Sequence, residues 1–160
     1  MNYGYITVAS AIPSVRVADA DYNIKQIESL IAQAEGKGAE IIVFPELSVT
    51  GYSCQDLFAQ QTLLDQTEMK ILQLLDFSRM LDIICIIGAP VCIGTGLYNC
   101  AVVCQHGNIL GIVPKRYLPN YGEFYEKRWF ASADDLDRPT EVRFAGNTIT
   151  VSPDIQLFQT

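Results

Sequence analysis

The sequence predicts a layered α/β fold within one domain. Apolar, strand-like runs alternate with amphipathic helical stretches up to residue 91, and pairs of short strands joined by tight turns follow them. The chain has 160 residues, of which 49% are hydrophobic and 18% charged, so it is long and apolar enough to bury a core. This order of elements favours a layered α/β fold over a purely doubly wound sheet.

The first part of the pattern is strand, helix, strand. Residues 6–11 predict the first strand, and either Asp19 or Asp21 is suited to cap the helix that follows. Residues 41–44 are apolar without interruption, as in a strand that is covered on both faces. The predicted apolar face of the helix consists of Ile24, Ile27, Ile31 and Ala34.

The second part begins with another helix, predicted over about residues 63–80, and a buried strand over residues 83–91. Two hairpins follow, with predicted turns at residues 106–107 and 146–147. The apolar stripe of the second helix is predicted to contain Leu64, Ile71, Leu72 and Leu75.

The end of the sequence is unusual for a domain. Ile155, Leu157 and Phe158 are apolar enough to form part of a further strand, yet nothing follows that would cover it. We therefore expect the sequence to be a truncated form of a longer chain.

The composition excludes several classes of partner. The net charge is -7 and the 11 basic residues form no run, which argues against nucleic acid or an anionic membrane as a partner. The N-terminus lacks a basic leader, and no stretch of about 18 apolar residues exists, so neither a signal peptide nor a membrane span is expected. The five cysteines are odd in number and mostly lie in apolar surroundings, so we expect a cytoplasmic protein without disulfides.

The stretch FPELSVTGY places a carboxylate at the end of a buried strand, because Glu46 follows the apolar run 41–44 and Pro45. As a structural residue, Glu46 would accept a backbone N–H or pair with an arginine. As a catalytic residue, it would be a general base, with burial disfavouring its charged form. The residues around it leave both interpretations open.

Lys115 lies just after a predicted strand, in the stretch IVPKRYLP. A lysine at such a position is most often a solvated surface group. If Lys115 faced Glu46 instead, the two side chains would pair, and the ammonium group could stabilise a developing oxyanion.

Glu123 lies eight residues further on, in the loop LPNYGEFYEKRWF. Five aromatic residues crowd this loop; such residues line many small-molecule pockets, but they also pack loops onto cores. His106, the one histidine, is predicted in a hairpin turn, which disfavours a histidine-dependent catalytic set. Cys100 and Cys104 share a strand face without a second pair of ligands, so no metal site is predicted.

Taken together and in this order, FPELSVTGY and PKRYLPNYGEFYEKRWF resemble the nitrilase, or carbon–nitrogen hydrolase, superfamily. The longer strings FPELSVTGYSCQDLF, GLYNCAVV and SPDIQLFQ resemble one branch of it, the N-terminal glutaminase domains of glutamine-dependent NAD synthetases. The resemblance extends from about Tyr5 to Thr160. It implies a nitrilase-like αββα sandwich, present here as a partial domain, and homo-oligomers.

The resemblance also implies roles for four residues. Glu46 matches the general base of the family, and Lys115 matches the lysine that stabilises the transition state. Glu123 matches the second glutamate, which helps to hold the site and the substrate. Tyr121 lies where this branch places a tyrosine against the glutamine substrate.

One member of the family's catalytic set is missing. The cysteine nucleophile of the family stands in a motif similar to ICEDLW, and none of the five cysteines here lies in such a motif. We therefore expect residues 1–160 to be the N-terminal part of one glutaminase domain, inactive alone, without its C-terminal part and the synthetase domain.

The resemblance implies glutamine as the substrate and no cofactor in this domain. ATP and Mg are expected in the synthetase domain, which would use the ammonia to amidate nicotinic acid adenine dinucleotide to NAD. Two alternatives stay open: a stand-alone nitrilase-family amidase, and a non-catalytic nitrilase-like binding domain.

Overall fold

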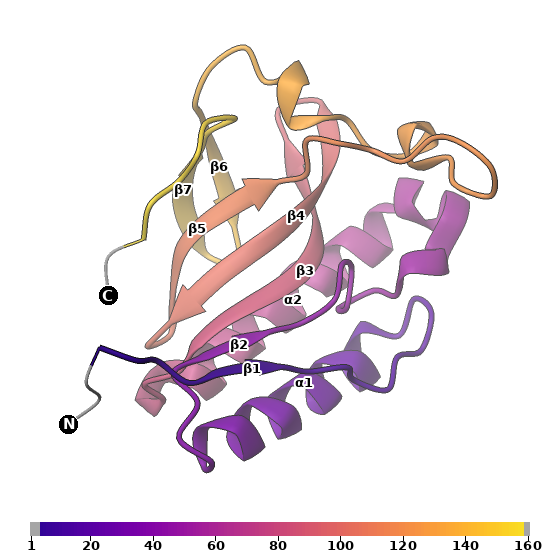
Figure 1. Cartoon of the computed structure of the whole chain (residues 1–160). Coiled ribbons are helices and arrows are strands. Elements are labelled where there is room, and N and C mark those ends of the chain that lie inside the picture. The colour runs from indigo at the N-terminus through magenta and orange to yellow at the C-terminus, as the bar shows by residue number, and fades with distance from the viewer. Residues whose placement is uncertain (1–3, 159–160) are drawn as a thin grey trace.

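Two helices cover one face of a mixed sheet (Figure 1). The structure is a computed structural model and describes residues 4–158. The sheet has the strand order β1-β2-β3-β4-β5, in which β1, β2 and β3 are parallel and the β3–β4 and β4–β5 pairs are antiparallel. These strands are β1 (Val8–Ser10), β2 (Ile41–Val43), β3 (Ile84–Ile93), β4 (Gly96–Gln105) and β5 (Asn108–Pro114).

The remaining elements within residues 4–158 are two α-helices, a separate hairpin and four short 3₁₀ segments. The helices are α1 (Ala20–Glu35) and α2 (Gln61–Phe77), and the hairpin consists of β6 (Thr140–Phe144) and β7 (Asn147–Val151). The 3₁₀ segments are η1 (Tyr52–Ala59), η2 (Ser78–Met80), η3 (Glu126–Arg128) and η4 (Ala133–Asp135). Among the described residues, no helix is long and apolar enough to cross a membrane.

Helix α1 confirms the predicted cap and apolar face. Of the two candidate caps, Asp19 accepts the backbone N–H of Tyr22 at 3.0 Å. The apolar stripe of α1 is buried against the sheet and includes the four predicted residues Ile24, Ile27, Ile31 and Ala34.

Helix α2 buries Ile71 and Leu75 as predicted, but differs from its prediction in its bounds and at Leu72. It begins at Gln61 and ends at Phe77, and Leu72 is 44% exposed, so its assignment to the buried stripe was wrong. The buried residues recur at intervals of three and four, which is the spacing of one helical face. They are Leu63, Thr67, Ile71, Leu74 and Leu75.

Both hairpins are present, and the second turns one residue earlier than predicted. Phe144 pairs with Asn147, so the turn consists of Ala145 and Gly146, both with positive φ. Glu68 of α2 accepts the backbone N–H of Ala145 at 2.9 Å, which fixes this turn against the helix. This contact, remote in sequence, explains why the local pattern misplaced the turn.

The strand predicted around residues 155–158 is absent from the structure. Ile155 and Leu157 are 93% and 94% exposed. Gln156 donates to the carbonyl of Ile112 at 2.8 Å, so the chain crosses β5 through a side-chain contact and does not extend the sheet.

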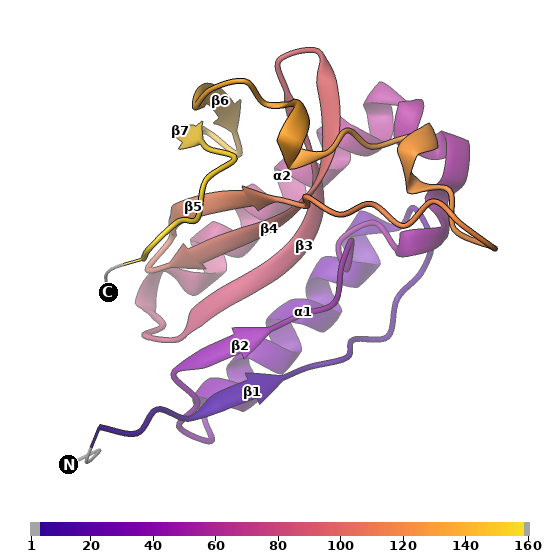
Figure 2. The ribbon, with the colours of Figure 1, turned by 45° about the horizontal axis from the view of Figure 1, so that its top comes forward.

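The two faces of the sheet have different surroundings. The helices lie on one side in both views, and the opposite face is uncovered over β1, β2 and β3 (Figure 2). The strand register places Val8, Ile41 and Ile84 in one row across that open face. One helical layer on one sheet is the content expected of a partial αββα sandwich.

Candidate active site

Glu46 lies at the carboxyl end of β2, in a loop held by backbone contacts. The N–H of Phe44 donates to the carbonyl of Ile86, and the N–H of Val49 donates to the carbonyl of Gly88 at 3.2 Å. A Cβ atom on Gly88 would lie 2.7 Å from the carbonyl carbon of Glu46, so only glycine lets the loop approach this closely. The Glu46 side chain is 51% exposed, so it faces solvent and not a dry interior.

Lys115 follows the last residue of β5 and is anchored on both sides. Its N–H donates to the carbonyl of Asn99 at 2.8 Å, and its carbonyl accepts from the N–H of Ala133 at 3.0 Å. Its ammonium group donates to both carboxylate oxygens of Glu46, at 2.9 and 2.8 Å. The sheet therefore brings the predicted pair together across 69 residues of sequence.

Glu126 supplies a second carboxylate that contacts Lys115. Lys115 Nζ lies 3.1 Å from Glu126 Oε1, and the Glu126 side chain is only 2% exposed. The same Oε1 atom accepts the hydroxyl of Tyr52 at 2.7 Å. Lys115 thus lies between one exposed and one buried carboxylate.

The structure does not place Glu123 in this cluster. Glu123 is exposed, whereas Glu126, three residues later, accepts a hydrogen bond from the Lys115 ammonium. The turn at Gly122, with φ of 58°, and the hydrogen bond from the N–H of Glu126 to the carbonyl of Pro119 direct the later glutamate inward. The role assigned to Glu123 stays a prediction.

Asn99 is a further site residue that the sequence did not single out. It lies on β4, is 2% exposed, and its amide donates to Glu46 Oε2 at 3.2 Å. Because its carbonyl also accepts from the N–H of Lys115, Asn99 contacts both members of the pair. The alternation of strand residues could have placed Asn99 on the open face, but no local pattern shows which residue it meets.

The pKa of Lys115 is affected in opposite directions. Burial of the ammonium group lowers the pKa, while the hydrogen bonds to Glu46 and Glu126 raise it. The carboxylates prevail, so the pKa of Lys115 lies above its ordinary value and the group is a fixed positive charge at neutral pH.

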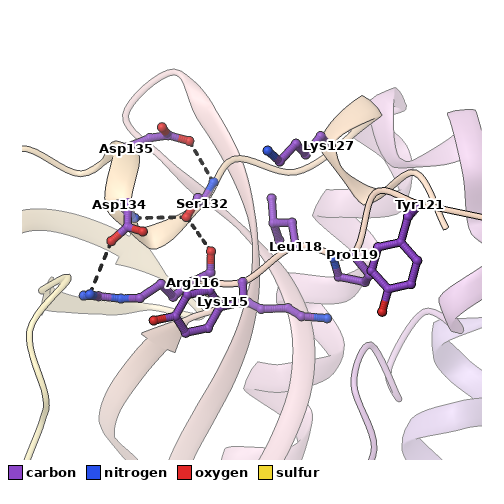
Figure 3. A pocket seen from close by; sticks show the side chains of 10 residues that line it. Lys115, Arg116, Leu118, Pro119, Tyr121, Lys127, Ser132, Asp134 and Asp135 are labelled. Carbon is purple, nitrogen blue, oxygen red and sulfur yellow. Dashed lines mark hydrogen bonds and ion pairs between the residues drawn. The ribbon is translucent and has the colours of Figure 1, made fainter.

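Lys115 also borders an open pocket of about 640 Å³ (Figure 3). Tyr121 lines the same pocket and is 74% exposed, so its ring is available to a ligand. The ion pair of Arg116 with Asp134 and the hydrogen bonds of Ser132 form the opposite wall. The geometry thus places Tyr121 beside a pocket that Lys115 reaches.

A second hollow, of about 290 Å³, extends from the Glu46–Lys115 pair along the open face of the sheet. Its walls are mainly apolar and include Val43, Ile86 and Val113. The candidate site therefore opens onto the face of the sheet that no helix covers.

None of the five cysteines is placed as a nucleophile. Cys54, Cys85, Cys100 and Cys104 are buried, and Cys92 is exposed at the far end of β3. Cys100 borders the smaller hollow through its strand position, but its side chain belongs to the core, and burial raises the pKa of its thiol. Among the described residues, no group of three or more His, Cys, Asp or Glu side chains could hold a metal ion.

The sequence matches the carbon–nitrogen hydrolase family over residues 7–157. A glutamine-dependent NAD(+) synthetase of Mycobacterium bovis is 36% identical over 153 residues, which are 96% of this chain and 22% of that protein. One of Arabidopsis thaliana is 40% identical over 114 residues, 71% of this chain and 16% of that protein. The chain thus spans about a fifth of the length of these relatives.

Solved structures agree with the fold. A glutamine-dependent NAD(+) synthetase from Cytophaga hutchinsonii matches with a TM-score of 0.83 and 27% identity, over 92% of this chain and 25% of that one. An amidase from Nesterenkonia sp. matches with a TM-score of 0.67 and 22% identity, over 92% of this chain and 55% to 56% of that one. These matches confirm the predicted nitrilase fold, present as a partial domain.

Proposed function

The chain belongs to the carbon–nitrogen hydrolase family and resembles the N-terminal part of glutamine-dependent NAD synthetases, and from this premise we propose that it is part of a glutaminase. The observation that supports the proposal is the pair of hydrogen bonds from the Lys115 ammonium to both carboxylate oxygens of Glu46. A carboxylate and a fixed ammonium in contact, open to solvent on one side, are the groups that amide hydrolysis through a thiol requires.

The roles of the two groups follow from the chemistry. A side-chain amide is a poor electrophile, so attack by a thiolate and formation of a thioester divide one difficult step into two. Glu46 would take the thiol proton, pass it to the departing ammonia, and then activate the water that cleaves the thioester. Lys115 would stabilise the oxyanion of each tetrahedral intermediate, an effect worth about 3 kcal/mol for one donor.

Tyr121 is proposed to contact the glutamine, because it lines the pocket that Lys115 borders. Glu126 is proposed to hold Lys115. The thiol itself has no counterpart among the five cysteines, so the chain alone is proposed to be inactive. In the longer enzyme, the ammonia would serve the ATP-dependent amidation that forms NAD.

Ammonia release from glutamine tests the proposal. We expect none from the 160-residue chain, and glutamine-dependent release from the product of the complete coding sequence. In that product, Glu46→Gln and Lys115→Met should each lower kcat/KM by at least about 100-fold. Lys37→Met, which removes an exposed lysine beyond the end of α1, is the matched control and should leave the rate unchanged.

Three results would contradict the proposal. Release of ammonia by the 160-residue chain, abolished by Glu46→Gln, would show that no further thiol is needed. Hydrolysis of simple aliphatic amides or nitriles in preference to glutamine would favour the stand-alone amidase. A complete product that contains no thiol motif and releases no ammonia would favour the non-catalytic binding domain.

A further inference from the structure

Tyr52 and Glu126 form a contact that the mechanism above does not use. The phenol hydroxyl of Tyr52 donates to Glu126 Oε1 at 2.7 Å, and the Lys115 ammonium donates to the same oxygen at 3.1 Å. The other oxygen, Oε2, is buried without a hydrogen-bond partner among the residues that the structure describes. Both of these hydrogen bonds to the buried Glu126 carboxylate are therefore accepted by the same oxygen, Oε1.

These contacts close a ring of side chains. Glu46 and Tyr52, the first residue of η1, lie six residues apart in the connection between β2 and α2. The side-chain amide of Asn23 fixes this connection by donating to the carbonyl of Val49 at 2.9 Å. From Glu46 the ring passes through Lys115 and Glu126 and returns at Tyr52. The connection therefore determines the position of Lys115 from two sides.

We propose that Tyr52 is a positioning residue of this site: its hydroxyl holds Glu126, and through Glu126 it fixes the Lys115 ammonium relative to Glu46. The consequence for catalysis rests on the function proposed above, whereas the positioning itself does not. Glu46, Lys115 and Glu126 carry two negative charges and one positive charge, so a neutral donor is needed if the second carboxylate is to stay ionised without another cation. The phenol of Tyr52 is that donor.

The Tyr52 hydroxyl also carries a signature of this arrangement. Burial raises the pKa of Tyr52, and the hydrogen bond to Glu126 and the charges of Glu126 and Glu46 raise it further. A tyrosine that merely packed its ring would not respond to the charge of either glutamate. The titration of this phenol therefore reports the contact directly.

Removal of the hydroxyl should leave the fold intact, because other contacts join the same segments. Asp56 of η1 accepts from Arg128 Nε at 2.8 Å and from Trp129 Nε1 at 2.9 Å. Phe58 packs edge-on against Phe130 with ring centroids 4.9 Å apart. A Tyr52→Phe variant keeps all of these contacts and loses one hydrogen bond.

The first experiment titrates Tyr52 by NMR in the 160-residue chain, with labelled tyrosine. In the Glu126→Gln variant, Tyr52 should begin to ionise at a pH about 1 unit lower, or more, than in the wild type, since a neighbouring negative charge is lost. In Glu46→Gln the onset should fall by less, because Glu46 acts only at a distance. An unchanged onset of ionisation in Glu126→Gln would overturn the proposal.

The second experiment follows the Lys115 ammonium by NMR in Tyr52→Phe. We expect its protons to exchange with water severalfold faster than in the wild type, because Glu126 is no longer held in place. Tyr22→Phe is the matched control: its hydroxyl also makes a side-chain hydrogen bond, to Ser14 at 3.2 Å, but far from the site. Equal exchange in wild type and Tyr52→Phe, with the fold intact, would overturn the proposal.

The two experiments separate this inference from the proposed function, because neither measures activity. In the product of the complete coding sequence, provided that it contains the cysteine nucleophile, Tyr52→Phe should lower kcat, while KM for glutamine stays within about twofold. If the NMR results hold and no glutamine is hydrolysed by that product, the positioning role of Tyr52 stands and the proposed function fails.

Discussion

Glu126 shows how one side chain determines the charge balance of the site. Its carboxylate is 2% exposed, and its only charged contact among the described residues is the Lys115 ammonium. A buried carboxylate that loses its cation keeps the full cost of desolvation. Lys115 is thus needed for stability as well as for the chemistry proposed for it.

Lys115→Met should therefore destabilise the chain by about 3 kcal/mol, because it leaves Glu126 buried without a counterion. The double variant Lys115→Met/Glu126→Gln removes the orphaned charge and should recover most of that loss. Urea unfolding of the three chains at pH 7 measures the difference. A single variant no less stable than the double variant would contradict this account.

At this scale the sequence predicted Glu46 and Lys115 but neither Glu126 nor Tyr52. Glu46 and Lys115 follow β2 and β5, and β3 and β4 lie between these two strands in the sheet. Asn99 of β4 contacts both residues and links their positions. Glu123 and Glu126 lie three residues apart in one loop, and the choice between them depends on the turn at Gly122. Such a turn depends on tertiary contacts, which the local sequence does not specify.

Strand β3 positions the Glu46 loop by close backbone contact at Gly88, which has no side chain. A Cβ atom on Gly88 would lie 2.3 Å from the backbone nitrogen of Leu47 and 2.4 Å from the carbonyl oxygen of Pro45. Both contacts are with backbone, so neither can be relieved by a rotamer change. The strand and the loop must separate if the residue grows.

Gly88→Ala should displace the loop and cost about 1–3 kcal/mol, as overpacking of a dense core does. The Lys115 ammonium should then exchange its protons faster, because Glu46 moves away from it. Gly36→Ala serves as the control, since its added Cβ would approach Ala32 O at 3.3 Å, far from the site. Unchanged stability in Gly88→Ala would show that the loop is not held by this close approach.

The contact between η1 and η3 gives a test of pH dependence. The Arg128 guanidinium, and then the Trp129 N–H, lower the pKa of Asp56 from 3.8 to about 2. Because the folded pKa is depressed, the folded state binds fewer protons than the unfolded one between pH 4 and pH 2. The stabilisation from Asp56 is thus complete above about pH 4 and is lost as the pH falls toward 2.

The free energy of unfolding of wild type and Asp56→Asn should therefore differ at pH 5 and converge as the pH approaches 2. Urea titrations at intervals between these values measure the difference. Arg128→Gln should remove the same pH dependence, because the guanidinium is its main cause. A constant difference between wild type and Asp56→Asn across the range would contradict the assignment.

At the scale of the whole molecule, the α/β order and the amphipathic face of α1 could be predicted, because burial of apolar stripes depends on periodicity. The helix α1 and both hairpins follow from it. The conformation of residues 155–158 could not be predicted from their apolar side chains alone, since Ile155 and Leu157 form no strand and are exposed. Apolar character predicts burial only where the fold offers a surface.

The open face of the sheet offers such a surface to a second molecule. Ile6 and Val8 are 59% and 56% exposed, and a hollow of about 320 Å³ beside them is lined by Ile41, Ile84 and Ile86. Exposed apolar patches of this kind favour association, and β1 is also an unpaired edge strand. We therefore expect the chain to self-associate through this face.

Val8→Lys should weaken that association about tenfold, because it places a charge in the apolar row at the edge of the sheet. Sedimentation equilibrium over a wide range of chain concentrations measures the constant. Met80→Lys is the matched control: Met80 is 91% exposed, but it lies in η2, just after α2, outside the apolar row of β1. If the chain were a monomer at every concentration, or if both variants weakened association equally, the apolar row of the open face would not be the contact surface. A selective effect of Val8→Lys would instead place the contact on the face of the sheet where the Glu46–Lys115 pair lies.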